Sequence, residues 1–391
     1  MYDIEQYRAS NTMDIFYDVI NDNRFIKHYK TGFSEIDRVT SGGFETGFGI
    51  INGVSSAGKT TLVTQIAYNM SEYGQPVIIF SLEMEKTALL AKSISMQSFK
   101  NHTSLFTANE ILSKDYMKNK TNQEMIDYRR IALDCGEATK NLIIVDRNTL
   151  GKSISADIVM DFVNDFMKQT GLKPVVFIDY LQRLAPCEEK KASSKQEIID
   201  DSIDKLWGFS HMNDLCIVAI SSLNRMSYKE GATLEGNKGS GNIEYSADFG
   251  LGIQFEGFDQ PDFNFNDAKK APIRKVELVI LKQRLGSAGY AIPYDYYAAY
   301  NIFTTNNEIY NNSNNDYIEF TTLNNLSENE KTFKKSQVNQ ENLCIINNED
   351  VNIQVRDNID DKRNDLLPFV KNPFKKDNST SSNKVDLSFN L

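Results

Sequence analysis

The sequence has few of the residue types that build a metal centre or a disulfide framework. It contains four cysteines and three histidines, and neither type falls at the spacing of a metal-binding motif. The cysteines form no framework pattern either, which favours a reducing compartment, and we expect the protein in the cytoplasm. These shortages argue against a histidine-based metal site and against a disulfide-stapled domain.

Long apolar runs and an excess of basic residues are also missing. The sequence holds no run of about 18 apolar residues, so it predicts no membrane span. Its first residues lack the basic and apolar regions of a signal peptide. The formal net charge of −10 excludes a globally basic nucleic-acid binder, although a local basic channel stays compatible with it. The 391 residues, 40% of them apolar, suffice for one large domain or two small ones.

One short stretch carries a specific chemistry. Gly53, Gly58, Lys59 and Thr60 fit the spacing G-x-x-x-x-G-K-[ST] of a phosphate-binding P-loop. Its glycines let backbone N–H groups surround a triphosphate, its lysine reaches the β- and γ-phosphates, and its threonine offers a hydroxyl to Mg²⁺. We therefore predict ATP and Mg²⁺ as ligands. The expected nucleotide-binding residues are Gly53, Ser55, Ser56, Ala57, Gly58, Lys59, Thr60 and Thr61.

Apolar runs alternate along the chain with segments of helical period. This alternation predicts an α/β fold with a mostly parallel, doubly wound sheet. The expected strands are 48–52, 76–81, 142–146, 173–179, 215–221, 249–255, 275–283 and 290–297. The better helical segments are 62–70, a helix from about 86, 108–113, 123–139, 156–169 and 196–212.

Two acidic residues follow predicted strands. Asp179 ends the strand 173–179, and Glu83 comes just after the strand 76–81. Ligands bind at the carboxyl ends of strands in an open α/β sheet, and ATP hydrolysis needs an acid on Mg²⁺ and a residue that orients water. We predict Asp179 for the metal, together with Thr60, and Glu83 for the water. The alternatives are an acid that caps a turn and a solvated loop carboxylate.

The two ends of the chain differ from its middle. Residues 1–30 contain a short helical stretch, either packed on its own core or acting as a linker helix on a neighbouring subunit. Residues 226–246 predict a long mobile loop. From 301 to 391, Asn, Ser, Lys and Asp dominate and predict a largely disordered tail, with the apolar stretch 366–374 as a docking peptide or an unremarkable segment. The motor region is thus expected over residues 31–300.

Several spaced motifs resemble the RecA-like C-terminal motor domain of DnaB-type replicative helicases, over about residues 30–297. They occur in the order found in that family. The segments are Thr31-Gly32-Phe33 with Ile36-Asp37, Ser81-Leu82-Glu83-Met84, Phe177-Ile178-Asp179-Tyr180-Leu181-Gln182, Ser221-Ser222-Leu223-Asn224-Arg225, Ser240-Gly241-Asn242-Ile243-Glu244 with Ala247-Asp248, and Lys282-Gln283-Arg284.

The resemblance implies a role for each of these sites. Lys59 and Thr60 would bind phosphate and Mg²⁺, Glu83 would be the catalytic carboxylate, and Asp179 would be the Walker B acid. Lys282 and Arg284 would act on the nucleotide of the neighbouring subunit, with Arg284 as the arginine finger. The alternative for this pair is a solvated strand end.

The resemblance also implies how DNA is held. A loop with Lys238, Gly239 and Gly241 would grip single-stranded DNA by its phosphates inside a homohexameric ring. The alternative is a flexible surface loop.

The sequence departs from the family at some positions. Ser222 stands where the family usually has Gln, Lys238-Gly239 stands for Arg-Glu, and Leu285-Gly286 stands for Asn-Gly. About 30 residues precede the motor region, so no counterpart of the family's N-terminal collar domain is expected.

The leading hypothesis is an ATP-dependent DNA helicase that moves on single-stranded DNA in replication, with a primase or loader protein as partner. The alternative is a RecA-like ATPase that serves as a nucleotide-switched scaffold or regulator without processive unwinding. A small-molecule kinase with the same P-loop would leave the other ordered motifs unexplained.

Overall fold

The fold is built on one large sheet. The computed structural model describes residues 3–10, 27–101, 104–151, 153–187, 194–224, 231–237, 242–284 and 286–305. Nine strands pair in the order β11-β10-β9-β8-β3-β7-β6-β4-β5. Their bounds are β3 Gly47–Gly53, β4 Val77–Ser81, β5 Leu142–Asp146, β6 Val175–Asp179, β7 Cys216–Ser222, β8 Phe249–Phe255, β9 Ile273–Gln283, β10 Ala291–Tyr297 and β11 Ile302–Thr304. All eight strands predicted from the apolar runs are confirmed.

The sheet has a parallel and an antiparallel part. The six strands from β8 to β5 are parallel, and β9, β10 and β11 extend the sheet in antiparallel pairing. The mostly parallel α/β architecture is therefore confirmed. Because the six strands run the same way, their carboxyl ends share one edge of the sheet and their amino ends share the other.

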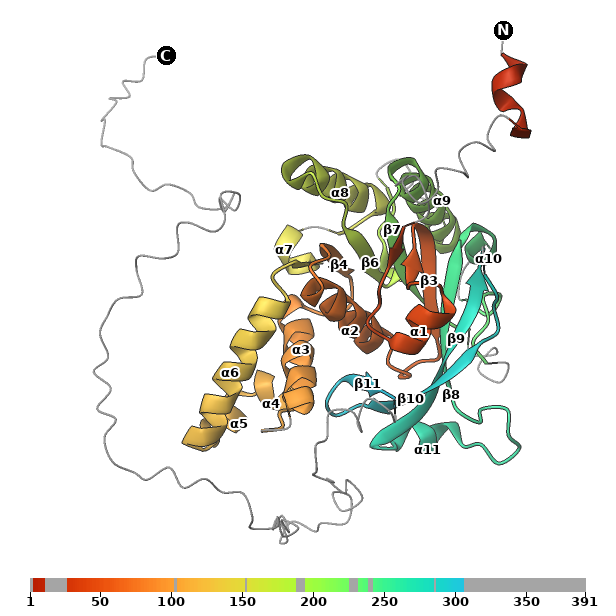
Figure 1. The fold of residues 1–391 in the computed structure, drawn as a ribbon. Coiled ribbons are helices and arrows are strands. Elements are labelled where there is room, and N and C mark those ends of the chain that lie inside the picture. The colour runs from red at the N-terminus through yellow and green to blue at the C-terminus, as the bar shows by residue number, and fades with distance from the viewer. Residues whose placement is uncertain are drawn as a thin grey trace, which may run out of the picture. The chain divides into compact units, whose positions relative to one another are not determined.

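Helices cover both faces of the sheet (Figure 1). The side chains of β6 alternate between the two: Val175 and Phe177 join one apolar cluster, and Val176 and Ile178 join the other. The first cluster includes residues of α1 (Ser34–Val39), α2 (Lys59–Glu72) and α3 (Lys86–Asn101). The second includes residues of α8 (Ala156–Thr170) and α9 (Lys195–Asn213). The sheet thus has one apolar core on each face, as a doubly wound fold requires.

Three of the predicted helices begin at a capping box. α4 (Ala108–Leu112), α6 (Asn122–Ala138) and α9 each start with a capping box, in which the residue before the helix and a glutamate three positions on exchange hydrogen bonds. The shorter helical elements are η1 Ile4–Tyr7, α5 Lys114–Lys118, α7 Arg147–Leu150, η3 Leu181–Arg183, α10 Asn242–Ser246 and α11 Phe265–Lys270.

The structure corrects the sequence prediction at three places. β11 extends the sheet to Thr304, within the segment predicted as a largely disordered tail. The loop predicted for 226–246 contains α10, and a bridge between Leu223 and Asn237 anchors residues before it. A small antiparallel pair, β1 (His28–Tyr29) with β2 (Phe44–Glu45), is absent from the predicted strands. These elements are too short to show a period in the sequence.

Some predictions fall outside the described residues. These are the N-terminal helix around residues 13–20, the tail from 306 to 391, and the proposed DNA-binding residues Lys238, Gly239 and Gly241. Within the described ranges, every helix is too short or too polar to cross a bilayer.

Candidate active site

The loop between β3 and α2 has the backbone of an anion cradle. β3 ends at Gly53 and α2 begins at Lys59. Gly58 precedes the helix in the left-handed region at φ +102°, and a Cβ there would lie 2.7 Å from Phe303 and 2.8 Å from Tyr296. Glycine offers no side-chain cap, so the first N–H groups of α2 can face an anion, which the helix dipole also favours. Position 58 therefore requires glycine on both conformational and steric grounds.

The Lys59 side chain folds back over this loop. Its Nζ donates hydrogen bonds to the carbonyl oxygens of Gly53 at 2.8 Å and Val54 at 3.1 Å. Burial lowers the pKa of Lys59 to about 8, while the negative charges of Asp179 and Glu83 act in the opposite direction. A buried ammonium at this loop is suited to bind a phosphate, whose negative charge would further stabilise the charged form of Lys59.

Asp179 and Thr60 meet beside the loop. Asp179 is the last residue of β6 and is only 3% exposed. Burial raises the pKa of Asp179 to about 6; the hydrogen bond from Thr60 opposes that rise, the Glu83 charge adds to it, and the Lys59 charge opposes it. The Oδ2 atom of Asp179 is buried without a hydrogen-bond partner. A buried carboxylate with one unused oxygen beside a threonine hydroxyl is an arrangement that a cation would complete.

Glu83 lies on the same edge, in the turn after β4. Ser81 pairs in register with Asp179, and the Leu82 N–H donates to the Asp179 carbonyl at 2.7 Å. The Ser81 hydroxyl closes the turn by donating to the Met84 carbonyl at 2.6 Å. Glu83 itself is exposed, and its charge acts on both Lys59 and Asp179. The structure thus brings the predicted P-loop residues and both predicted acids to one edge.

The end of β7 lies between the P-loop strand and the Asp179 strand. Ser222 pairs in register with Gly53, so the residue that departs from the usual glutamine adjoins the P-loop. The preceding residue, Ser221, accepts a hydrogen bond from Gln182 Nε2 at 2.8 Å. This contact connects the segment after Asp179 to the strand beside the P-loop.

Lys282 and Arg284 lie at the opposite edge. Lys282 pairs with Gly250 and Gln283 with Phe249, near the amino end of β8, and Phe249 pairs with Gly49 of β3. The Lys282 Nζ donates to the Glu244 carbonyl at 2.7 Å, and Arg284 forms an ion pair with Asp248 at 2.9 Å. Gly53 is four residues beyond Gly49, which is about 13 Å along the strand. The structure therefore does not bring these two cations to the P-loop of their own chain.

A known family combines this sheet, P-loop and strand-end motifs. The model of the DnaB-like helicase C-terminal domain matches residues 29–305. The chain belongs to this family.

Curated relatives support the assignment. The DnaB-like region is 27% identical over 263 residues to the replicative DNA helicase DnaB of Geobacillus stearothermophilus. It is 26% identical over 263 residues to the replicative DNA helicase DnaC of Bacillus subtilis strain 168. Each match covers 66% of this chain and 52% of the relative, so the chain spans about half the length of these relatives.

Solved structures share the DnaB-like fold. One of them, described as an ATPase domain, matches with a TM-score of 0.61 and 23% identity, covering 76% of this chain and 97% of that chain. A DnaB-like replicative helicase, described with its interactions with primase, matches with a TM-score of 0.61 and 22% identity over 76% of this chain and 68% of that chain. At sequence identities this low, the similarity to these two structures shows a shared fold.

Two further cations contact the DnaB-like P-loop, and sequence reasoning missed both. Arg274, at the start of β9, donates from Nη1 to the Ser56 carbonyl at 2.6 Å. Lys92 of α3 donates to the Thr61 hydroxyl at 3.2 Å and to the Asn301 side chain at 2.8 Å, and burial lowers the pKa of Lys92. Their partners lie up to 218 residues away in the chain, and such distant pairings leave no local pattern to detect.

The residues of this DnaB-like site fit Mg²⁺. The cation prefers hard oxygen ligands and keeps several waters, so it needs few protein groups. Thr60 and the partnerless Asp179 oxygen provide two such groups. Among the described residues, no cluster of three or more His, Cys, Asp or Glu could hold a metal by itself. Mg²⁺ would therefore bind here together with a nucleotide.

Proposed function

We propose that this chain hydrolyses ATP as the motor of a ring-forming, DnaB-type DNA helicase. Its nucleotide site would form between two copies of the chain, and its substrate would be single-stranded DNA during replication. The nucleotide-switched scaffold is not favoured, because the family consists of DnaB-like helicases. A cytoplasmic location is an expectation of this role.

The observation that carries the proposal is the separation of charges across the sheet. Lys59, Asp179 and Glu83 occupy the carboxyl edge, while Arg284 and Lys282 occupy the amino edge. An arginine finger stabilises charge on the transferred phosphoryl group, so it must reach the γ-phosphate. Within one chain, the register of β3, β8 and β9 places Arg284 too far from the P-loop to reach a phosphate bound there. A second copy, with its amino edge against the P-loop of the first, would supply Arg284 and make hydrolysis depend on assembly.

The chain's own residues then divide the chemistry. Lys59 binds the β- and γ-phosphate oxygens, and the N–H groups at the start of α2 bind the remaining phosphate charge. Thr60 and Asp179 would hold Mg²⁺, which neutralises phosphate charge when it is bound. Glu83 orients the attacking water and polarises its O–H bond. Arg284 of the next subunit stabilises the transition state.

DNA and protein partners extend the proposal. Six copies of Lys238, with Gly239 and Gly241, would line a central channel with positive charge although the chain is acidic overall. A related DnaB-like helicase is described with its interactions with primase, and we propose a primase or a loader protein as a partner here.

The test is the ATPase rate with and without single-stranded DNA, on protein whose size is measured with Mg²⁺ and nucleotide. A hexamer whose rate rises with DNA, and which displaces a strand from a forked duplex, is the expected result. The Lys59→Ala variant is the control for contaminating ATPase. A monomer whose ATPase rate does not change with DNA would contradict the proposed motor function. A ring that DNA stimulates but that separates no strands would support the alternative, a nucleotide-switched scaffold.

A further inference from the structure

Two buried carboxylates lie beside Arg284 at the amino edge. Glu45, at the end of β2, is 5% exposed, and the side chain of Asp248, just before β8, is 4% exposed. Buried acids are rare unless positive charge or hydrogen bonds compensate them. The P-loop, Asp179 and Glu83 lie at the other edge, so these two acids belong to a different part of the molecule.

Asp248 holds both the sheet and the guanidinium. Its Oδ2 accepts the Phe48 N–H at 2.7 Å and lies 3.4 Å from His211 Nε2. Its Oδ1 lies 2.9 Å from Arg284 Nε, an ion pair whose N–H does not point straight at the oxygen. One oxygen is thus fixed by the backbone of β3, and the other is directed at Arg284.

Glu45 lies near the same arginine. Burial raises the pKa of Glu45 and the Asp248 charge adds to that rise, while His28, the main-chain N–H of Arg284 and the Arg284 charge lower it. Two buried acids thus adjoin Arg284: Asp248 forms an ion pair with its side chain, and Glu45 lies close to its main chain.

The outer part of the guanidinium stays available. The Arg284 side chain is 49% exposed, and Asp248 contacts it through Nε, the nitrogen closest to the main chain. No contact of its terminal amino groups is found within the described ranges. The two terminal N–H donors of a guanidinium match the geometry of a phosphate.

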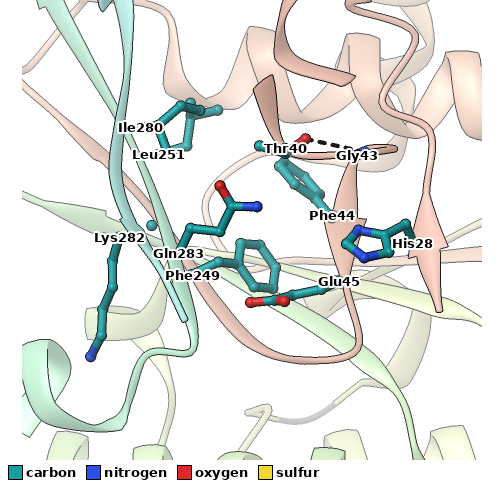
Figure 2. A pocket seen from close by; sticks show the side chains of 11 residues that line it. His28, Thr40, Gly43, Phe44, Glu45, Phe249, Leu251, Ile280, Lys282 and Gln283 are labelled. Carbon is teal, nitrogen blue, oxygen red and sulfur yellow. Dashed lines mark hydrogen bonds between the residues drawn. The ribbon is translucent and has the colours of Figure 1, made fainter. Parts of the chain in front are cut away.

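The cavity at this edge is too small for a ligand. It is lined by His28, Glu45, Phe249 and Gln283 among others (Figure 2). Its volume is about 20 Å³, which is close to the space of a single water. The cavity beside Glu45 therefore offers no room for a ligand, and Arg284 adjoins both buried acids.

We propose that Asp248 and Glu45 are positioning residues for Arg284, which they hold with its terminal amino groups directed at the triphosphate of the adjacent subunit. The inference rests on the proposed function. Its physical basis is that a long arginine side chain has many conformers, and fixing it before the reaction removes that entropy from the barrier. Neither acid touches the nucleotide.

The first test replaces Asp248 by Asn in the full-length chain. Asn keeps an oxygen for the Phe48 N–H but loses the charge that holds Arg284. We expect DNA-stimulated kcat to fall about 10-fold or more, with the KM for ATP within about 2-fold of the unmodified value. The matched control is Asp214→Asn, because Asp214 is an 81% exposed acid after α9 whose left-handed backbone Asn also tolerates. It should leave both constants unchanged.

Mixed assemblies separate positioning from general damage. An Asp248→Asn subunit keeps its own P-loop but offers a poorly held Arg284, while a Glu83→Ala subunit does the reverse. Mixing the two in equal amounts should restore activity, because about a quarter of the boundaries in a random mixture then join an intact P-loop to a well-held arginine. Mixing Asp248→Asn with Arg284→Ala should restore none. Failure of the Glu83→Ala mixture to rescue would overturn the inference.

Glu45 gives a second and independent pair of variants. Glu45→Ala removes the buried side chain that lies near the Arg284 main chain and should reproduce the rescuable loss of kcat. Glu45→Gln keeps the shape and one oxygen of that side chain and should retain nearly full activity. This pair decides the question if Asp248→Asn does not fold, and wild-type kcat in Glu45→Ala would contradict the proposal. If Arg284→Ala itself hydrolyses ATP normally, the proposed function fails instead.

Discussion

The two edges of the sheet are built in different ways. The carboxyl edge holds a P-loop that is contiguous in sequence, with two acids on neighbouring strand ends, and all of them lie within one chain. The amino edge holds Lys282 and Arg284, whose partners among the described residues are the Glu244 carbonyl and the Asp248 carboxylate. One edge thus resembles a site that can bind a nucleotide by itself, and the other resembles a set of donors prepared for another molecule. Under the proposed function, nucleotide binding would need the carboxyl edge of one chain, whereas hydrolysis would need that edge together with the amino edge of the next chain.

The largest expected effect comes from the amino edge. Arg284→Ala should lower kcat by about 10³- to 10⁵-fold, the range found for arginine fingers, because the transition-state charge loses its partner. ATP binding should persist, since the P-loop of the same chain is untouched. Turnover and the binding of a fluorescent nucleotide would be measured side by side. Arg38→Ala, which removes an exposed arginine of α1, is the matched control.

Mixed rings sharpen this prediction. Combining Arg284→Ala with Glu83→Ala should restore part of the activity, because each subunit supplies what the other lacks. If no mixing ratio restored activity, the proposal that two subunits share one nucleotide site would be wrong.

Unlike a change at the amino edge, a change at the carboxyl edge should weaken nucleotide binding as well as turnover. Lys59→Ala should lower kcat by about 10²-fold or more and should also weaken nucleotide binding, because the charge that contacts the phosphates is lost. The comparison with Arg284→Ala is the measurement: one variant loses binding and turnover, and the other loses turnover alone. If both retained the same affinity for ATP, the division between the two edges would be wrong.

Two truncations test how the last strand supports the P-loop. A chain ending at Thr305 should keep its stability and ATPase rate, whereas a chain ending at Tyr300 should lose about 3–5 kcal/mol of unfolding free energy. The shorter chain loses Phe303, which stacks on Tyr296 at 4.4 Å and exchanges two hydrogen bonds with Gln65. Denaturant unfolding of both chains measures the difference. Equal stability would mean that β11 is dispensable.

The smallest expected effect is the number of protons released or taken up when Mg-ATP binds. Mg²⁺ favours the ionised Asp179, whose pKa is about 6 without nucleotide, so binding at pH 6 should release about half a proton. Phosphate favours the charged Lys59, whose pKa is about 8, so binding at pH 8 should take up about half a proton. Titration calorimetry of Mg-ATP in two buffers of different ionisation enthalpy measures both. Asp179→Asn should abolish the release at pH 6, and Arg284→Ala should change neither value.

The sequence predicts the carboxyl edge far better than the amino edge. The P-loop has fixed spacing, and Asp179 and Glu83 follow strong apolar strands, so local pattern alone places them together. Glu45 belongs to a two-residue strand without a period, and the contact between Asp248 and Arg284 joins segments whose pairing depends on the register of β8 and β9. Motif order points to Arg284, but only the fold shows which groups hold it.

The strand β9 has a mechanical consequence. It is eleven residues long, about 36 Å, and it is hydrogen-bonded to β8 on one side and to β10 on the other. Arg274 near its start touches the nucleotide loop of its own chain, and Lys282 near its end precedes Arg284. Residues 276–279 are paired on both sides, whereas Lys282 pairs with β8 alone and follows a register shift opposite Gly250 and Leu251. In the ring that we propose, β9 would form the covalent path from the P-loop contact of one subunit to the arginine that it offers to the next.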